Sequence, residues 1–427
     1  MRIHRAFASS ALVLSVVVAA RVAPAVAKDD AAKAAADVAG ELGAYAKACL
    51  DVGGKTEAEA ALAEGEALGA AAGPALAAAK TALEAVAEEA ADAAAKVEPL
   101  RKAAAPKIAK AYDKLAAALA SPDAPARAEA AVLAALRWEA AKPRLARAQR
   151  IVDEGFKGNR PWAAARALAA MRKADPDGAA KYDRIELAEG MKGQLMLGSP
   201  DHPLLAYVAL PKDWQKGKTY PVFVGAEGAG CGFLGYFNAA KSTRGSRAAI
   251  VVVPCGFTNT NALDPAKYPF YDPALLKEYD TRRMDFDGPG MDKILEIVTK
   301  RFGGDEKVFL TGFSGGGKYC YWKLFMDPAH VRGAAPACAN FDGQGISSPP
   351  APGADGGPVV RLMTGANDEH RDHVFGQKPG IEGQTDAAEA KLKELGYQHV
   401  SRVQLQAGHS PLHAEVWKFI DEVLGKK

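Results

Sequence analysis

Two patterns of apolar positions divide the chain. Before about residue 180, apolar side chains recur three or four positions apart, as at Leu76, Ala79, Leu83, Val86, Ala90 and Val97. This spacing lines one face of a helix. After that point, short apolar runs such as residues 220–226 and 248–254 stand between Gly, Pro and charged residues. Such runs are typical of buried strands.

The first region, residues 28–182, is dominated by Ala with Glu, Lys and Leu. Ala has the highest helix propensity, so composition and spacing agree. Breaks such as "GGK", "GPA", "EPL" and "APK" predict roughly six helices. We interpret the region as a helical bundle or spacer. A repeat-type interaction module is the alternative, although no fixed period of repeat length is present. The sequence identifies no protein partner for this region.

In the second region, residues 183–427, predicted strands alternate with predicted helices. The strands are expected at 204–210, 220–226, 248–254, 307–312, 331–338, 357–365 and 400–408. The helices are expected at 290–302, 315–326, 386–396 and 411–424. This alternation predicts an α/β domain with a mainly parallel sheet. In such sheets the chemistry lies in loops at the carboxyl ends of the strands.

The first 27 residues have the three parts of an export signal. Arg2 and Arg5 precede an apolar run from Ala6 to Ala20, and the small residues Ala25 and Ala27 come before a charged stretch. This layout predicts a signal peptide at 1–27, cleaved after Ala27. An uncleaved membrane anchor is the alternative, but the run is shorter than a bilayer span requires. We therefore expect an exported protein, periplasmic or extracellular, with no membrane span after cleavage.

Charge and cysteine content narrow the function classes. Lys and Arg number 54 against 51 Asp and Glu, for a net charge of +3, and no basic cluster stands out. Nothing in this balance indicates a nucleic-acid partner. Five cysteines are too few for a disulfide-built scaffold.

The stretch "VFLTGFSGGGKYC", residues 308–320, contains the clearest motif. Its G-x-S-x-G pattern, between a predicted strand and a predicted helix, is typical of a nucleophile elbow with Ser314 as the nucleophile. The same residues are also close to a phosphate-binding loop ending at Lys318. That loop requires Ser or Thr next, to hold Mg²⁺, whereas this chain has Tyr319.

Two further residues follow later strands in the order of a hydrolase triad. Asp368 comes after the strand at 357–365, and His409 after the strand at 400–408. The order Ser, Asp, His is that of the α/β-hydrolases. His409 would act as general base and Asp368 would orient its imidazole. The residues considered as rivals are Glu369, Asp372 and Asp342 for the acid, and His413 for the base.

The oxyanion hole of such a site requires two backbone N–H groups. Gly315, directly after the nucleophile, is the first candidate. Ala229, in the loop after the strand at 220–226, is the second. The cluster "DEHRDH" near the acid contains His370 and His373, but it has no companion ligand group. We expect no metal site and no cofactor.

Residues from about 190 to 427 resemble secreted α/β-hydrolase-fold esterases, of the broad group containing polyhydroxyalkanoate depolymerases and feruloyl or acetyl-xylan esterases. The resemblance rests on "KVFLTGFSGGG", "LMTGANDEH", "AGHSP" and "EGAGCG". It implies Ser314 as nucleophile, Asp368 as acid and His409 as base. One departure concerns the oxyanion loop, where the family usually has His-Gly and this chain has Glu227 before the Gly. A carboxylate there would repel an oxyanion unless its side chain turned away.

The resemblance also makes neighbours of the strands before Cys231 and Cys255. In an exported protein these two cysteines could form a disulfide or remain thiols. A long insertion between Pro254 and Asp287 carries Tyr268, Phe270 and Tyr271, and is either a lid over the substrate or a surface excursion.

Together these observations predict an exported serine hydrolase that cleaves carboxylic esters, either small molecules or polymers. A peptidase of the prolyl-oligopeptidase type uses the same triad order and is an alternative. A non-catalytic scaffold or binding protein based on the helical region is another.

Overall fold

The computed structural model describes residues 25–69, 73–119, 131–136, 138, 146–149, 151, 161–178, 194–268 and 270–425. The chain divides into two compact units. One runs to Ile185 and includes Pro269–Asp272, and the other comprises Glu186–Tyr268 with Pro273–Lys427. The predicted domain boundary at 182/183 lies outside the described residues, as do residues 1–24 of the predicted signal peptide. Within the described ranges, no helix combines the length and apolar character that a bilayer crossing requires.

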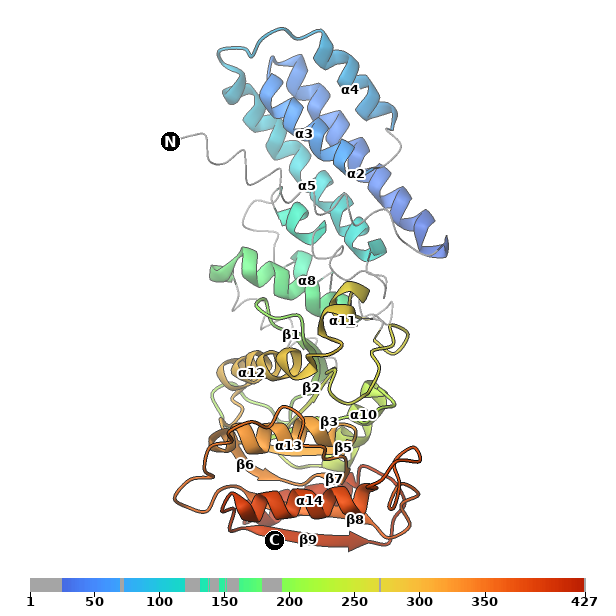
Figure 1. The fold of residues 1–427 in the computed structure, drawn as a ribbon. Helices are drawn as coiled ribbons and strands as arrows, with labels where there is room; N and C mark the ends of the chain where they lie inside the picture. Colours follow the sequence, from blue (N-terminus) through green and yellow to red (C-terminus); the bar gives the residue numbers. More distant parts are fainter. Residues whose placement is uncertain are drawn as a thin grey trace. The chain divides into compact units, whose positions relative to one another are not determined.

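The named elements of the first unit, among its described residues, are helices (Figure 1). They are α2 (Ala25–Asp51), α3 (Lys55–Ala67), α4 (Pro74–Glu84), α5 (Ala93–Leu119), α8 (Pro161–Ala174) and the 3-10 turn η1 (Pro176–Gly178). Helix α2 packs against α3, α4 and α5. The approach of α2 to α4 depends on Gly43, where a side-chain carbon would lie 2.5 Å from the backbone nitrogen of Leu76. Small residues thus let these helices pack backbone to backbone.

Two helix breaks predicted in this unit are wrong. Helix α5 continues through Pro99 and Pro106, where the sequence predicted that it would end and restart. A proline inside a helix costs about 3 kcal/mol. The buried face formed by Ile108, Tyr112 and Leu115 outweighs that cost, because α5 packs along α2.

The second unit is built around one twisted sheet (Figure 1). Its strands are β1 (Gln194–Gly198), β2 (Leu205–Ala209), β3 (Val222–Ala226), β4 (Ile250–Pro254), β5 (Val308–Ser314), β6 (Val331–Ala334), β7 (Ala337–Ala339), β8 (Val359–Gly365) and β9 (Val400–Leu405). They run in the order β1-β2-β4-β3-β5-β6-β8-β7, with β9 beside β8. The pairs β1–β2 and β2–β4 are antiparallel, and the other pairs are parallel. The predicted α/β architecture with a mainly parallel sheet is confirmed.

Helices cover both faces of this sheet. They are α10 (Phe233–Arg244), α11 (Pro273–Tyr279), α12 (Arg283–Phe302), α13 (Gly317–Met326), α14 (Ile381–Glu394) and α15 (His413–Val423). On one face, Trp417 of α15 stacks on Phe223 of β3 at 4.9 Å and donates a hydrogen bond to α10. On the other, Arg402 of β9 pairs with Glu382 of α14. The core therefore lies on both faces of the sheet, between the sheet and the helices that cover it.

Several elements differ from their predicted bounds. Strand β1 and helix α10 were not predicted, and α11 lies within the insertion after Pro254. The single strand expected at 331–338 is split into β6 and β7, because Pro336 between them has no N–H for the ladder. Helix α12 begins at Arg283 rather than at residue 290, and this places Asp287 on a buried face.

Candidate active site

Ser314 is the last residue of β5 and has a φ of +48°. A non-glycine residue rarely adopts this left-handed conformation, and such strain is concentrated at functional sites. The turn continues through two glycines into α13. A side-chain carbon at Gly312 would lie 2.4 Å from the Gly316 carbonyl oxygen, and one at Gly316 would lie 2.2 Å from that of Ala226. The G-x-S-x-G spacing thus reflects close backbone contacts on both sides of the serine.

Asp368 and His409 are brought together at the carboxyl ends of β8 and β9. His409 Nδ1 lies 2.9 Å from Asp368 Oδ2, while Asp368 Oδ1 accepts the backbone N–H of His370 at 2.7 Å. The Asp368 side chain is 1% exposed and that of His409 is 10% exposed. A buried carboxylate held at both oxygens fixes the ring orientation and leaves Nε2 as the free ring nitrogen.

The rivals of these two residues are engaged elsewhere. Glu369 accepts the backbone N–H of His409 rather than its ring. Asp342 pairs with Lys318 at 2.8 Å, and Asp372 is exposed. Burial lowers the pKa of His413 to about 4, and its ring packs on Tyr236 at 4.5 Å. His413 is therefore a neutral core histidine.

The serine lies at the same edge of the sheet as the acid and base. Strand β5 pairs with β7 through Ser314 and Ala339, and β7 pairs with β8. The ring of Phe313 lies 4.8 Å from that of His409. Among the described residues, no hydrogen bond joins Ser314 Oγ to His409. Such bonds are often long without substrate and tighten only in the complex.

Two backbone N–H groups near the serine have no hydrogen-bond acceptor among the described residues. Within the described part of the chain, neither the N–H of Gly315 nor that of Ala229 makes a hydrogen bond. Gly228 brings the second of these close to the serine, since a side-chain carbon at Gly228 would lie 3.1 Å from Ser314 Cβ. The two segments predicted to supply an oxyanion hole are thus adjacent.

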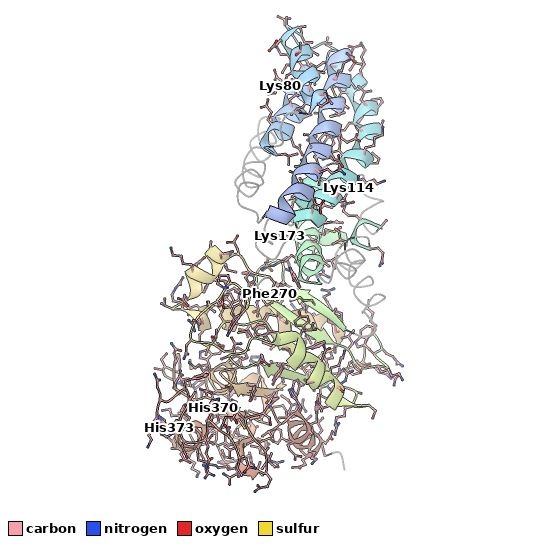
Figure 2. All side chains as sticks on the ribbon, turned by 90° about the vertical axis from the view of Figure 1, so that its right-hand side faces the viewer. Lys80, Lys114, Lys173, Phe270, His370 and His373 are labelled. Carbon is pink, nitrogen blue, oxygen red and sulfur yellow. The ribbon has the colours of Figure 1, made fainter. Side chains whose placement is uncertain are left out.

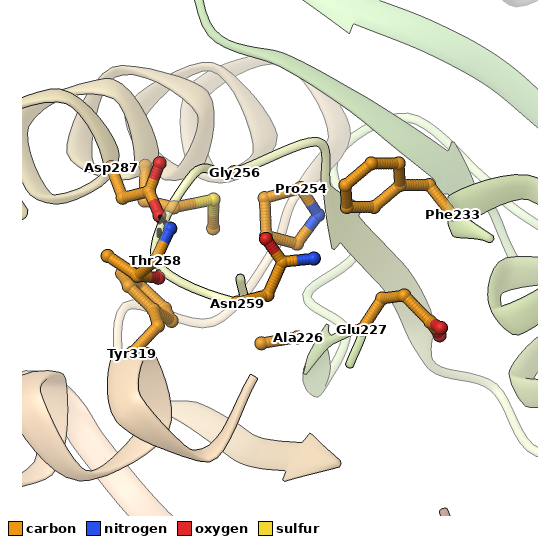
Figure 3. Close-up of a pocket in the computed structure, with 10 residues that line it drawn as sticks. Ala226, Glu227, Phe233, Pro254, Gly256, Thr258, Asn259, Asp287 and Tyr319 are labelled. Atoms are coloured by element: carbon orange, nitrogen blue, oxygen red, sulfur yellow. Dashed lines mark hydrogen bonds between the residues drawn. The ribbon is translucent and has the colours of Figure 1, made fainter. Parts of the chain in front are cut away.

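The Glu227 side chain extends toward the start of α10. Its Oε1 lies within 3.8–3.9 Å of where side-chain carbons at Gly230 and Gly232 would be. Figure 3 shows the carboxylate extending away from Asn259 and Asp287. Burial raises the pKa of Glu227 to about 7, although N–H groups of Gly232 and Gly228 act against this shift.

The suggested disulfide is wrong for this structure. No disulfide joins any of the five cysteines, all of which lie in the described part of the chain and are buried. The Cys231 thiol instead lies 3.4 Å from the Tyr268 hydroxyl and 3.7 Å from Asn259 Nδ2, so it packs into a polar cluster and away from a bridge. Cys255 is fully buried, and burial raises its pKa.

The suggested substrate loop is also corrected, because its aromatic residues are buried. Tyr268 packs against Phe257 and Phe233, at 5.4 and 5.8 Å, and donates its hydroxyl to Asn259. Phe270 and Tyr271 belong to the first unit, where Phe270 packs on Trp162. Their side chains serve packing, so none of the three is available as an exposed wall for a substrate.

Cys338 is a neighbour of the acid that the sequence did not single out. Its Sγ, the Asp368 carboxylate and a His409 ring nitrogen lie within 4.8 Å of one another. The same carboxylate and ring are joined by the hydrogen bond between Asp368 and His409. Burial raises the pKa of Cys338 to about 11, so the thiol is protonated at neutral pH and is a poor nucleophile.

His370 and His373, labelled in Figure 2, follow the acid on the second unit. The His370 ring lies 4.7 Å from that of His409 and 5.5 Å from that of Phe375. Phe375 is 76% exposed, which is unusual for a residue of this size. The rings of Phe375 and His370 thus form a row of contacts between the surface and His409.

Hollows lie beside and behind the elbow. Two of about 390 and 470 Å³ share Asn261 and Lys318 among their lining residues. A third, of about 10 Å³, is lined by residues that include Asn259, Asp287 and Tyr319 (Figure 3). Asn259 and Asp287 were missed by sequence reasoning, although both belong to the loop and helix that follow strand β4.

No family model matches this chain, and no curated protein sequence matches it either. Similar solved structures include poly(aspartic acid) hydrolase-1 from Sphingomonas sp. KT-1, at 15% identity over 55% of this chain and 99% of that one, with a TM-score of 0.39. Another is S-formylglutathione hydrolase from Staphylococcus aureus, at 14% identity over 54% of this chain and 95% of that one, with a TM-score of 0.38. A third is poly(3-hydroxybutyrate) depolymerase from Bordetella parapertussis, at 15% identity over 56% of this chain and 92% of that one, with a TM-score of 0.39.

Proposed function

We propose that the second unit is a serine hydrolase that cleaves carboxylic esters through an acyl-enzyme. One observation carries the proposal. Ser314 is held at positive φ on a strand-to-helix turn, at the same sheet edge as an imidazole oriented by a buried carboxylate 2.9 Å away. A strained serine and an oriented base at one edge are the combination that acyl transfer requires.

The reaction follows from these positions. His409 Nε2 takes the proton of Ser314 as the hydroxyl oxygen attacks the ester carbonyl carbon. The carbonyl oxygen becomes negative and is stabilised by the N–H groups of Gly315 and Ala229. The carbon–oxygen bond to the alcohol then breaks, and the alcohol leaves with the proton from His409. Water repeats the sequence against the acyl-enzyme and releases the acid.

Asp368 takes no proton in this scheme. It keeps the Nδ1 proton of His409 in place, so that Nε2 is the basic nitrogen, and it stabilises the imidazolium that forms. The second oxygen of Asp368 is held by the His370 N–H, which prevents rotation of the carboxylate.

A hydrolysis panel with Ser314→Ala tests the proposal. Nitrophenyl esters of short acids are compared with peptide amides. We expect turnover of the esters, and we expect Ser314→Ala to retain only residual catalysis, on the order of 10³–10⁴ over water. Ester turnover that survives the substitution contradicts the assigned nucleophile. Preference for peptide amides favours a peptidase, and the absence of both activities favours a non-catalytic protein.

We also propose that the protein is exported. The charged, apolar and small-residue segments of residues 1–27 support this proposal. Mass spectrometry of the protein from culture medium or periplasm is expected to find a mature N-terminus at Lys28.

A further inference from the structure

Asn259 lies in the loop after β4 and is 5% exposed. Both ends of its side-chain amide are used. Nδ2 donates to the Gly228 carbonyl oxygen at 2.8 Å, and Oδ1 accepts the Tyr268 hydroxyl at 2.8 Å. In Figure 3, Asn259 lies between Ala226 and Asp287, and all three residues line the small hollow. A buried amide with both ends hydrogen-bonded has a fixed orientation.

The bond to Gly228 also fixes the next residue. In a planar trans peptide, the carbonyl and the N–H of the same unit point in opposite directions. The carbonyl of Gly228 belongs to the peptide whose N–H is that of Ala229. It is held by Asn259 and also accepts the N–H of Cys231 at 3.1 Å. Holding the Gly228 carbonyl therefore aims the Ala229 N–H in the opposite direction.

The backbone of Asn259 contacts the other donor segment. A side-chain carbon at Gly315 would lie 1.8 Å from the Asn259 carbonyl oxygen. The loop after β4 is therefore in direct contact with the turn that carries the Gly315 N–H. One residue touches both segments that bear the two unpaired donors.

Asp287 of α12 holds this loop from the other side. Its carboxylate accepts the N–H groups of Phe257 and Thr258, at 2.7 and 2.8 Å, and the Thr258 hydroxyl at 2.7 Å. Asp287 is 3% exposed. A side-chain carbon at Gly256 would lie 2.6 Å from its Oδ2, so the loop and the carboxylate fit closely. Asp287 thus anchors the two residues before Asn259, and Tyr268 anchors the side chain of Asn259 itself.

We propose that Asn259, held by Tyr268 and Asp287, is a positioning residue that sets the geometry of the oxyanion hole. The inference rests on the proposed function, because it requires a negative oxygen between Gly315 and Ala229. Asn259 does not contact the reacting atoms, and it acts through the Gly228–Ala229 peptide. The oxyanion exists only as the reaction proceeds, so the effect belongs to kcat rather than KM.

Asn259→Ala tests the proposal on a short nitrophenyl ester. Loss of one oxyanion donor costs on the order of 10²–10³ in kcat. A donor that is present but misaimed is expected to cost roughly 10- to 100-fold in kcat, with KM changed less than about threefold. Asn238→Ala, an exposed asparagine of α10, is the matched control and should keep both constants.

Tyr268→Phe provides a second variant if Asn259→Ala fails to fold. It removes one hydroxyl and leaves Asn259 in place, and kcat is expected to fall roughly 3- to 10-fold. The specific readout is the affinity for a trifluoromethyl ketone that forms an oxyanion on the serine, compared with that for a ground-state ketone isostere. In both variants the affinity for the trifluoromethyl ketone should weaken in proportion to kcat. The affinity for the ground-state isostere should not change.

The outcomes separate this inference from the proposed function. If ester turnover does not depend on Ser314, the proposed function fails. If turnover depends on Ser314 but folded Asn259→Ala and Tyr268→Phe keep wild-type kcat, only the positioning role is wrong. Equal weakening of both ketones also contradicts it, because that pattern indicates general damage to the pocket.

Discussion

At the scale of single residues, chemically alike side chains have unlike roles because their surroundings differ. His409 has a carboxylate 2.9 Å from one ring nitrogen, whereas His413, four residues later, is packed among rings and stays neutral. Asp368 is buried against the base, whereas Asp342 forms an ion pair with Lys318. Residue type alone therefore does not select the proposed acid and base, and the proposal rests on the contact between Asp368 and His409.

Asp368→Asn tests the role of the carboxylate. The amide has nearly the same shape, but its nitrogen cannot accept the Nδ1 proton, so it favours the wrong imidazole tautomer. We expect kcat to fall on the order of 10⁴-fold with little change in KM. Steady-state ester kinetics at neutral pH measure this. A loss smaller than tenfold would indicate that Asp368 is not the acid.

At the scale of elements, the turn between β5 and α13 is tightly packed against neighbouring backbone. Gly312, Gly315 and Gly316 each lie where a side-chain carbon would meet neighbouring backbone at 2.4 Å or less. The motif could be recognised from sequence because these contacts permit only glycine. The neighbouring loops were less readable, since nothing in the chain order indicates that β3 lies between β4 and β5.

Gly315→Ala is expected to disrupt the turn. The added carbon would overlap the Asn259 carbonyl, so one of the two segments must move. We expect kcat to fall by on the order of 10²–10³, similar to the loss of a donor. Gly235→Ala in α10 is the control, because it has no atom within 4 Å of the added carbon. It should keep activity and gain about 0.5–1 kcal/mol in unfolding free energy.

The sequence predicted the β5 turn from its glycine spacing, and it singled out Asp368 and His409 because each follows a predicted strand. The structure brings these two side chains into contact. Sequence reasoning missed Asn259 and Asp287, whose significance depends on the β4–β3–β5 order. It placed breaks at Pro99 and Pro106, where packing of α5 overrides local propensity. It left the insertion with Tyr268 open between a lid and a surface excursion, because an aromatic residue in a long insertion carries no sign of whether it is buried.

At the scale of the whole second unit, buried carboxylates give stability a dependence on pH. Burial raises the pKa of Glu227 to about 7 and that of Asp287 to about 6. Between their ordinary values and these raised values, the folded state holds protons that the unfolded state releases. The free energy of unfolding that these two carboxyls contribute is therefore highest at low pH and falls as the pH rises to about 7. Above pH 7 it no longer changes.

Glu227→Gln tests this dependence. The amide cannot ionise, so the loss of stability between pH 5 and pH 8 should be smaller than in the unaltered protein. Urea midpoints from hydrogen exchange of β3 and β5 amides measure it. The exposed Glu306→Gln is the control and should keep the original dependence. If Glu227→Gln loses as much stability between pH 5 and pH 8 as the unaltered protein, the Glu227 carboxylate is ionised over that whole range and the expected dependence is contradicted.

The most direct test of the account is covalent labelling of the full chain with a fluorophosphonate probe, followed by mass spectrometry of its peptides. The probe reacts with a serine only when a base and an oxyanion hole activate it, so it needs no knowledge of the natural ester. We expect one modified residue, Ser314, and loss of labelling in His409→Ala. Labelling at another serine, or none under conditions that modify a known serine esterase, would contradict it.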